Sequence, residues 1–214
     1  MTDVPRTSPV PRVPDRPGIP GARAVHHVAY TVPDLDQAVA FFTNVLGARL
    51  LYRLGPVAAP PGDAAWMTRQ LGVHREAVAH IAMLRLGPVS NLELFQYTAP
   101  DQRREPPANS DWGGHHLAIA VDDVDLAVAY LRRQPGVEVL GEPQTIADGG
   151  PIDGDRWVYF RTPWGLQLEV LAMPAGMPYE RATAERLFAP SGPWTARNGA
   201  DGDADMSRHG AGPT

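Results

Sequence analysis

Residues 113–125 read Gly-Gly-His-His-Leu-Ala-Ile-Ala-Val-Asp-Asp-Val-Asp, and residues 26–36 read His-His-Val-Ala-Tyr-Thr-Val-Pro-Asp-Leu-Asp. The two stretches align at a constant offset of 89 residues, so that His26 matches His115. They share the paired histidines, an alanine, a valine and two aspartates. Each pattern is typical of a strand that leads through a turn into a helix. The repeat therefore predicts two copies of one supersecondary unit.

Alternation along each stretch indicates which histidine faces a cavity. Successive side chains of a strand point to opposite faces of the sheet. In the second copy the large apolar residues share one face, which suits packing under a helix, and His116 lies on the other face with two alanines. The same alternation places His27 on the small-residue face of the first copy. We therefore expect His27 and His116 to line a cavity, and His26 and His115 to point the other way.

The composition is that of a globular protein and excludes several kinds of chemistry. Hydrophobic residues make up 43% of the 214 residues and charged residues 20%, which is ordinary for a soluble domain. The chain has no cysteine, so a disulfide, a thiolate zinc site and a cysteine nucleophile are excluded. It also has no lysine, which excludes Schiff-base chemistry and a P-loop lysine.

Charge and hydropathy give expectations about partners and location. The formal net charge is −5 and no basic stripe is present, so we expect no nucleic-acid partner. No apolar run approaches the roughly 20 residues that span a bilayer, and the N-terminus lacks the apolar core of a signal peptide. We therefore expect no membrane association and a cytoplasmic location.

The predicted fold class is α+β, with two tandem modules that each contain a strand, a helix and three further strands. In the first module we expect strands at 25–32, 50–54, 77–86 and 91–97, helices at 35–46 and 66–73, and a loop at 55–64. In the second module we expect a helix at 124–131 and strands at 137–140, 156–161 and 166–171. His80, in the third predicted strand, is expected to be a buried structural histidine.

The modules lie between segments of different character. The predicted organisation is a disordered proline-rich arm at 1–23, a first βαβββ module at 24–98, a linker at 99–112, a second βαβββ module at 113–173, a C-terminal extension with a short helix at 174–197 and a disordered tail at 198–214.

The last strand of each module carries one acidic residue between apolar neighbours. Glu93 lies between two leucines, and Glu169 lies between a leucine and a valine. A single strand glutamate most often faces solvent. Here each module has one histidine in its first strand and one glutamate in its last. This repetition favours a functional role for the four residues over simple exposure to solvent.

Two histidines and two glutamates suit a divalent metal ion. Imidazole and carboxylate ligands favour Zn, Fe, Mn, Co or Ni. Four protein ligands, His27, Glu93, His116 and Glu169, would leave two adjacent positions of an octahedral ion open. A substrate with two neighbouring oxygens could bind there, and the ion would act as a Lewis acid.

These motifs resemble the vicinal oxygen chelate superfamily, which includes glyoxalase I, methylmalonyl-CoA epimerase, extradiol dioxygenases and bleomycin-resistance proteins. The resemblance covers about residues 25–173 and rests on the stretches His27-Val28-Ala29, Leu92-Glu93-Leu94, His116-Leu117-Ala118 and 159–169. It implies a cupped mixed sheet around a metal site whose ligands fall on His27, Glu93, His116 and Glu169. It also implies a homodimer. The segment 176–180 and Trp157 and Trp164 look similar to a subset that includes 2-epi-5-epi-valiolone-type cyclitol epimerases.

The resemblance implies a metal-dependent isomerase or epimerase that acts on a small vicinal hydroxy-ketone, such as a cyclitol or a sugar-like ketone, through an enediolate bound to the ion. Glu169 is the expected base and Glu93 its counterpart on the opposite face. Three alternatives remain open from the sequence. These are a lyase similar to glyoxalase I, an iron-dependent ring-cleaving dioxygenase and a non-catalytic binding or resistance protein. Trp157 and Tyr159 share one strand face, and either pocket lining or core packing would fit them.

Overall fold

The computed structural model describes residues 19–187 of the chain. The predicted disordered tail at 198–214 lies outside the described residues, as does most of the predicted arm at 1–23. No helix between residues 19 and 187 is long and apolar enough to cross a membrane.

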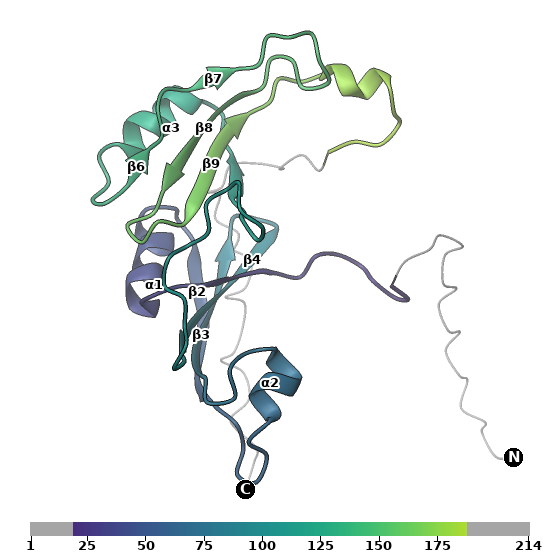
Figure 1. Cartoon of the computed structure of the whole chain (residues 1–214). Coiled ribbons are helices and arrows are strands. Elements are labelled where there is room, and N and C mark those ends of the chain that lie inside the picture. The colour runs from purple at the N-terminus through teal and green to yellow at the C-terminus, as the bar shows by residue number, and fades with distance from the viewer. Residues whose placement is uncertain (1–18, 188–214) are drawn as a thin grey trace, which may run out of the picture.

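The first module forms a four-stranded sheet with one helix along it (Figure 1). Its elements are β1 (Val28–Thr31), α1 (Leu35–Asn44), β2 (Arg49–Val57), α2 (Trp66–Leu71), β3 (Val78–Leu86) and β4 (Ser90–Thr98). The strand order is β1-β4-β3-β2. β1 runs parallel to β4, and the other neighbours are antiparallel.

The second module repeats this topology on a smaller scale. Its elements are β5 (Leu117–Ala120), α3 (Val124–Leu131), β6 (Glu138–Val139), β7 (Gln144–Thr145), β8 (Arg156–Arg161) and β9 (Gln167–Ala172). The strand order is β5-β9-β8-β6, and β7 pairs with β8 beside this path. β5 is parallel to β9, as β1 is to β4. A 3-10 helix follows at Pro178–Arg181.

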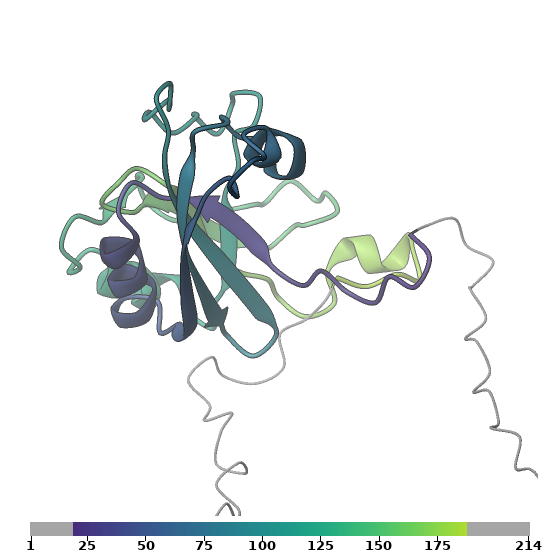
Figure 2. The same ribbon diagram turned by 90° about the horizontal axis from the view of Figure 1, so that it is seen from below.

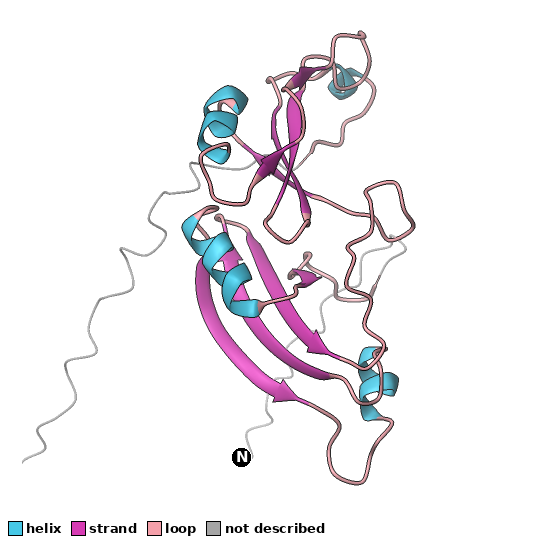
Figure 3. Ribbon diagram, turned by 60° about the vertical axis from the view of Figure 1, so that its left-hand side comes forward, coloured by secondary structure: helices cyan, strands magenta, loops and turns pink. Residues whose placement is uncertain are grey.

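The predicted α+β class with two related modules is confirmed, but some details differ from the expectation. The strands form two separate sheets within the chain (Figure 3), not one cupped sheet. β2 continues to Val57, through the first residues of the predicted loop, because it keeps pairing with β3 as far as Ala79. His80 is exposed, not buried.

Aspartates begin both module helices. The Asp34 carboxylate accepts a hydrogen bond from the Gln37 backbone amide at 2.8 Å, and the Asp123 carboxylate accepts one from that of Leu126 at 3.0 Å. Such caps satisfy backbone amides that have no partner inside the helix. The predicted helix-start acids therefore have a structural role at the N-terminus of each helix. α1 lies to one side of the sheet of the first module (Figure 2).

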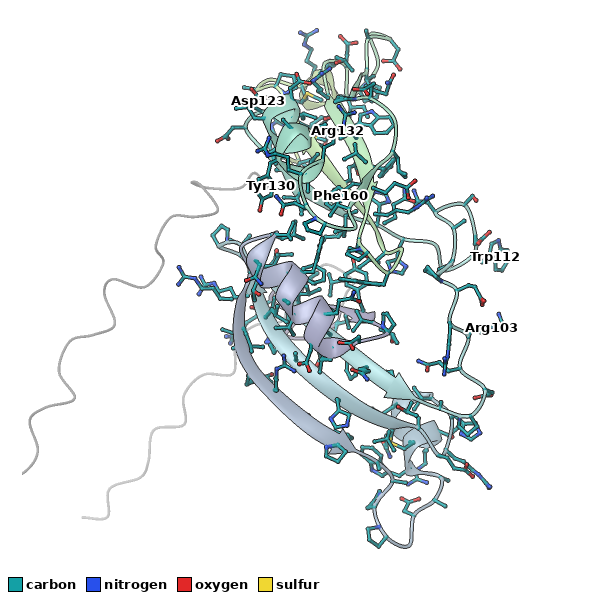
Figure 4. The ribbon with its side chains drawn as sticks, turned by 90° about the vertical axis from the view of Figure 1, so that its left-hand side faces the viewer. Arg103, Trp112, Asp123, Tyr130, Arg132 and Phe160 are labelled. Carbon is teal, nitrogen blue, oxygen red and sulfur yellow. The ribbon has the colours of Figure 1, made fainter. Side chains whose placement is uncertain are left out.

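The helix-bearing sides of the two modules meet in one continuous apolar core. Phe41 and Phe42 of α1 lie 5.3 and 6.3 Å from Trp164 of the β8–β9 turn, measured between ring centroids. The Tyr130 hydroxyl of α3 donates a hydrogen bond to the Val45 carbonyl oxygen at 3.0 Å. Tyr130 and Phe160 lie on the side of the second module that faces the first (Figure 4). The modules are therefore joined through the sides that carry their helices.

We expect Phe42→Ala to lower the free energy of unfolding by about 3–5 kcal/mol, the usual cost of removing a buried phenylalanine side chain. Phe42 is fully buried where the modules meet. Leu126→Ala is the control, because Leu126 is 70% exposed on α3. Urea unfolding followed by circular dichroism measures both. A loss in Phe42→Ala no larger than in the control would contradict the position of Phe42 in the shared core.

Candidate active site

The first module brings together His27 and Glu93, which we call the first half-site. His27 directly precedes β1, and Glu93 lies in β4 opposite Ala29 in the parallel ladder. The Nε2 atom of His27 is 3.2 Å from the Oε2 atom of Glu93. Both side chains are partly exposed, at 37% and 18%. The histidine and the carboxylate meet because β1 pairs in parallel with β4, which places the start of β1 beside Glu93.

The second module repeats this arrangement with His116 and Glu169, which we call the second half-site. His116 directly precedes β5, and Glu169 lies in β9 opposite Ala118. The Nε2 atom of His116 is 3.0 Å from the Oε2 atom of Glu169. Glu169 is the more buried of the two acids, with a side chain that is 10% exposed.

Both half-sites lie on the sheet faces that point away from the core. Leu92 and Leu94, on either side of Glu93, are buried against the helix, as are the neighbours of Glu169. His115 lies on the helix side, where its ring stacks on that of Tyr30 at 5.1 Å. The ring of His26 lies beside that of His27, with the two Nδ1 atoms 2.8 Å apart.

Within residues 19–187, the two half-sites lie apart from one another. No group of three or more histidine, aspartate or glutamate side chains within residues 19–187 is close enough to hold one metal ion. The four residues named from the sequence therefore form two pairs. This separation follows from the fold, because the modules pack through their helix sides while the half-sites occupy the opposite faces.

His116 is oriented by Asn109, a linker residue that sequence reasoning missed. The Nδ1 atom of His116 is 3.2 Å from the Oδ1 atom of Asn109. The Asn109 side chain therefore lies within hydrogen-bond distance of one ring nitrogen of His116, while the other, Nε2, faces Glu169. In the loop around Asn109, the Asp111 amide donates a hydrogen bond to the Ala108 carbonyl oxygen, and the Ala108 amide donates one to the Asp111 carboxylate. Nothing periodic in the linker sequence marks Asn109 as a partner of this histidine.

Aromatic side chains border each half-site. The ring of Tyr159 lies 5.0 Å from that of His116 and 5.1 Å from that of Trp157. Phe95 and Tyr97 stack at 5.3 Å on the same face of β4 as Glu93. Burial raises the pKa of Tyr159, with a further rise from the charge of Glu169. Trp157 and Tyr159 therefore lie on the functional face and not in the core.

Two buried carboxyl groups lie in the second module. Burial raises the pKa of Glu169 above its ordinary value, the charge of His116 acts in the opposite direction, and the charge of Asp155 raises it further. Asp155 is 5% exposed, and its Oδ1 atom has no hydrogen-bond partner. Burial also raises the pKa of Asp155. No sequence pattern selects Asp155, which directly precedes β8.

The second half-site fits one side of a divalent metal site. His116 Nε2 and the Glu169 carboxylate lie within hydrogen-bond distance of one another. The distances of 3.0 and 3.2 Å in the two half-sites are those of a hydrogen bond between imidazole and carboxylate, two donor types that also bind divalent ions.

Comparison with protein families gives one match over most of the chain. The model of the Glyoxalase/Bleomycin resistance protein/Dioxygenase superfamily matches residues 26–158. The glyoxalase family protein APC24694 from Bacillus cereus has the same fold, with a TM-score of 0.53 and 23% identity over 73% of this chain and 99% of that one.

The curated relatives of this chain include two kinds of epimerase. The chain is 68% identical to a 2-epi-5-epi-valiolone epimerase from Actinomyces sp. over 183 residues, which are 86% of this chain and 97% of the relative. It is 32% identical to mitochondrial methylmalonyl-CoA epimerase from Bos taurus over 60% of this chain and 63% of that protein.

We expect Asp155→Asn to raise the thermal unfolding midpoint at neutral pH. The folded state raises the pKa of Asp155, so the ionised carboxyl destabilises the fold at neutral pH, and this cost disappears as the pH falls below the unfolded pKa of about 4. The advantage of the variant should therefore shrink toward acidic pH. Calorimetry across this range measures it, with Asp101→Asn as an exposed control. A variant less stable than the wild type at neutral pH would show that Asp155 is paired.

Proposed function

The chain belongs to the glyoxalase/bleomycin resistance protein/dioxygenase superfamily and is an epimerase, and we propose that it inverts a stereocentre of 2-epi-5-epi-valiolone with the help of a divalent metal ion. The observation that carries the choice of substrate is the 68% identity to an enzyme with this name over nearly the full length of both chains. The substrates of more distant relatives, such as methylmalonyl-CoA, find less support, because those relatives match 60% of the chain at about half that identity. This assignment favours an epimerase over the lyase, dioxygenase and binding-protein alternatives.

The proposed metal ligands are His27, Glu93, His116 and Glu169. Each histidine offers Nε2 to the carboxylate beside it, and the donor types suit Zn, Mn, Co, Ni or Fe. When bound, such an ion supplies Lewis acidity that stabilises negative charge on a substrate oxygen.

Glu169 is the proposed proton-transfer residue. Its carboxylate removes the proton from the carbon next to the substrate carbonyl, and the electron pair of that C–H bond moves to the carbonyl oxygen. Return of a proton to the opposite face of the same carbon inverts the stereocentre, and Glu93 is the proposed donor there. Burial raises the pKa of Glu169, which makes its carboxylate a stronger base at neutral pH.

Asn109 and Tyr159 are proposed to support this chemistry without transferring the proton. Asn109 contacts His116 at Nδ1 and so orients the imidazole with Nε2 toward Glu169. Tyr159 packs edge-on against the same imidazole and limits its rotation. A histidine supported in this way holds its ligand geometry without reorganising when the substrate arrives.

We expect protein purified without chelator to contain a divalent ion that His116→Ala loses. His115→Ala is the matched control, because His115 is the neighbouring residue but stacks on Tyr30 on the other side of the strand. Inductively coupled plasma mass spectrometry measures the ion content, and circular dichroism verifies folding. Equal ion loss in both variants would show that the loss does not come from the half-site.

We expect Glu169→Gln to reduce proton exchange at the substrate carbon by about 10²–10⁴-fold, the usual contribution of a general acid or base. The amide keeps the shape of the side chain but cannot accept the proton. The measurement is deuterium incorporation into 2-epi-5-epi-valiolone in D₂O, followed by NMR. Glu138→Gln, an exposed strand residue paired with Arg161, is the control. Undiminished incorporation by Glu169→Gln would remove Glu169 from the proton-transfer role.

A further inference from the structure

The second half-site lies at one end of a row of aromatic rings. The imidazole of His116 meets the ring of Tyr159 edge-on at 5.0 Å, and the indole of Trp157 follows 5.1 Å from Tyr159, with the two ring planes tilted by 59°. Both aromatic side chains come from β8, and we call Trp157 and Tyr159 the aromatic platform. The platform therefore begins beside a proposed metal ligand and extends away from it along the sheet.

The aromatic platform lies on the same face of the second sheet as Glu169. Val158, between the two aromatic residues, and Phe160, after them, are buried in the core. Because successive side chains of a strand point to opposite faces, Trp157 and Tyr159 point away from that core. Both are only partly buried. Their rings therefore offer apolar surface to a ligand on the face that carries the half-site.

The strand register sets the distance between Glu169 and each member of the aromatic platform. Tyr159 lies directly opposite Glu169 in the β8–β9 ladder, and Trp157 lies opposite Leu171, two residues further along. The Cβ atoms of a directly opposite pair are about 5 Å apart, and those of a diagonal pair about 7–8 Å. A six-membered ring with one carbon beside the Glu169 carboxylate therefore reaches over Tyr159 toward Trp157.

Polar side chains lie around the aromatic platform. Asn109 is within hydrogen-bond distance of His116 at one end. Gln144 lies opposite Trp157 in the β7–β8 ladder and is exposed. Gln167 lies two residues before Glu169 on β9, on the same face. An apolar surface with amide groups at its edges suits a ligand that has apolar faces and a polar rim.

A carbon ring that carries several hydroxyl groups is such a ligand. Its hydroxyl groups project mainly from the rim, and the C–H groups on its faces carry slight positive charge because of the attached oxygens. The faces of tyrosine and tryptophan rings carry the negative part of the aromatic quadrupole, so they attract these C–H groups. An open-chain ketone has no rigid face to place on the rings and gains less from them.

We propose that Trp157 and Tyr159 bind the cyclitol ring of the substrate by stacking, and that Trp157 determines the preference for a cyclic substrate. The inference rests on the proposed function and names the surface that recognises the ring. Trp157 lies diagonal to Glu169 in the ladder, so it contacts the ring away from the carbon that exchanges its proton. Its loss therefore weakens substrate binding more than it slows the chemical step.

The first test is the steady-state epimerisation of 2-epi-5-epi-valiolone by substituted proteins. We expect Trp157→Ala to raise KM by about tenfold, the effect of losing one aromatic stacking contact, and to leave kcat nearly unchanged. Trp157→Phe keeps an aromatic face and should recover most of the affinity, whereas Trp157→Leu keeps only apolar bulk and should not. Trp112→Ala is the matched control, because Trp112 is wholly exposed on the linker (Figure 4).

The second test detects contact between the substrate ring and the indole of Trp157 by fluorescence. Stacking changes the surroundings of the indole, so 2-epi-5-epi-valiolone should change the tryptophan emission of the wild-type protein. Trp157→Phe should lose this change, and Trp112→Phe should keep it. Circular dichroism and the metal content of each variant verify that the fold and the half-site are intact. This measurement does not depend on the rate of turnover.

The outcomes distinguish this inference from the proposed function. An unchanged KM in Trp157→Ala, or a KM that leucine restores as fully as phenylalanine, overturns stacking on Trp157 and leaves the epimerase intact. The same holds for a wild-type emission that the substrate does not change, or a change that persists in Trp157→Phe. Loss of the bound ion in Trp157→Ala also overturns it, since the residue would then act through the metal site. A wild-type protein that does not epimerise 2-epi-5-epi-valiolone overturns the proposed function, and the emission test still decides whether Trp157 contacts the ring.

Discussion

The apolar contact between α1 and the β8–β9 turn sets the geometry on which both half-sites depend. Phe41 and Phe42 meet Trp164 there, and the two module helices are close enough for Tyr130 to reach Val45. Because one face of each sheet is buried in this core, only the opposite face can bind a ligand. The half-sites therefore open away from the core, and the chain presents two incomplete sites instead of one closed cup.

Much of the fold could be predicted from the sequence, and so could the residues that pair in each half-site. The repeat of paired histidines predicted two modules, and alternation along the strands selected His27 and His116 over their neighbours. Both predictions rest on strand alternation and helix capping, which are local properties of the chain. Glu93 and Glu169 were found by the same logic, although they lie 76 residues apart while the matched histidines lie 89 apart. The first module carries α2 and longer strands, which accounts for this difference.

What the sequence did not predict depends on contacts between distant segments. Asn109 reaches His116 through the course of a linker that has no periodic pattern. Asp155 became notable only once its carboxyl was seen buried without a partner for one oxygen. The way in which the modules pack was also not predictable, because the same apolar helix faces suit a single cupped sheet or two sheets joined through their helices.

The loop that joins the modules limits where the chain can accept inserted residues. Loops between modules usually accept insertions, because they carry few specific contacts. Here Asn109 holds the imidazole of His116, and a side chain at Gly114 would collide with the Ala108 carbonyl oxygen. A residue added between 108 and 114 would therefore change the orientation of a histidine ring instead of only lengthening a tether. The linker between the modules is therefore a structural part of the second half-site.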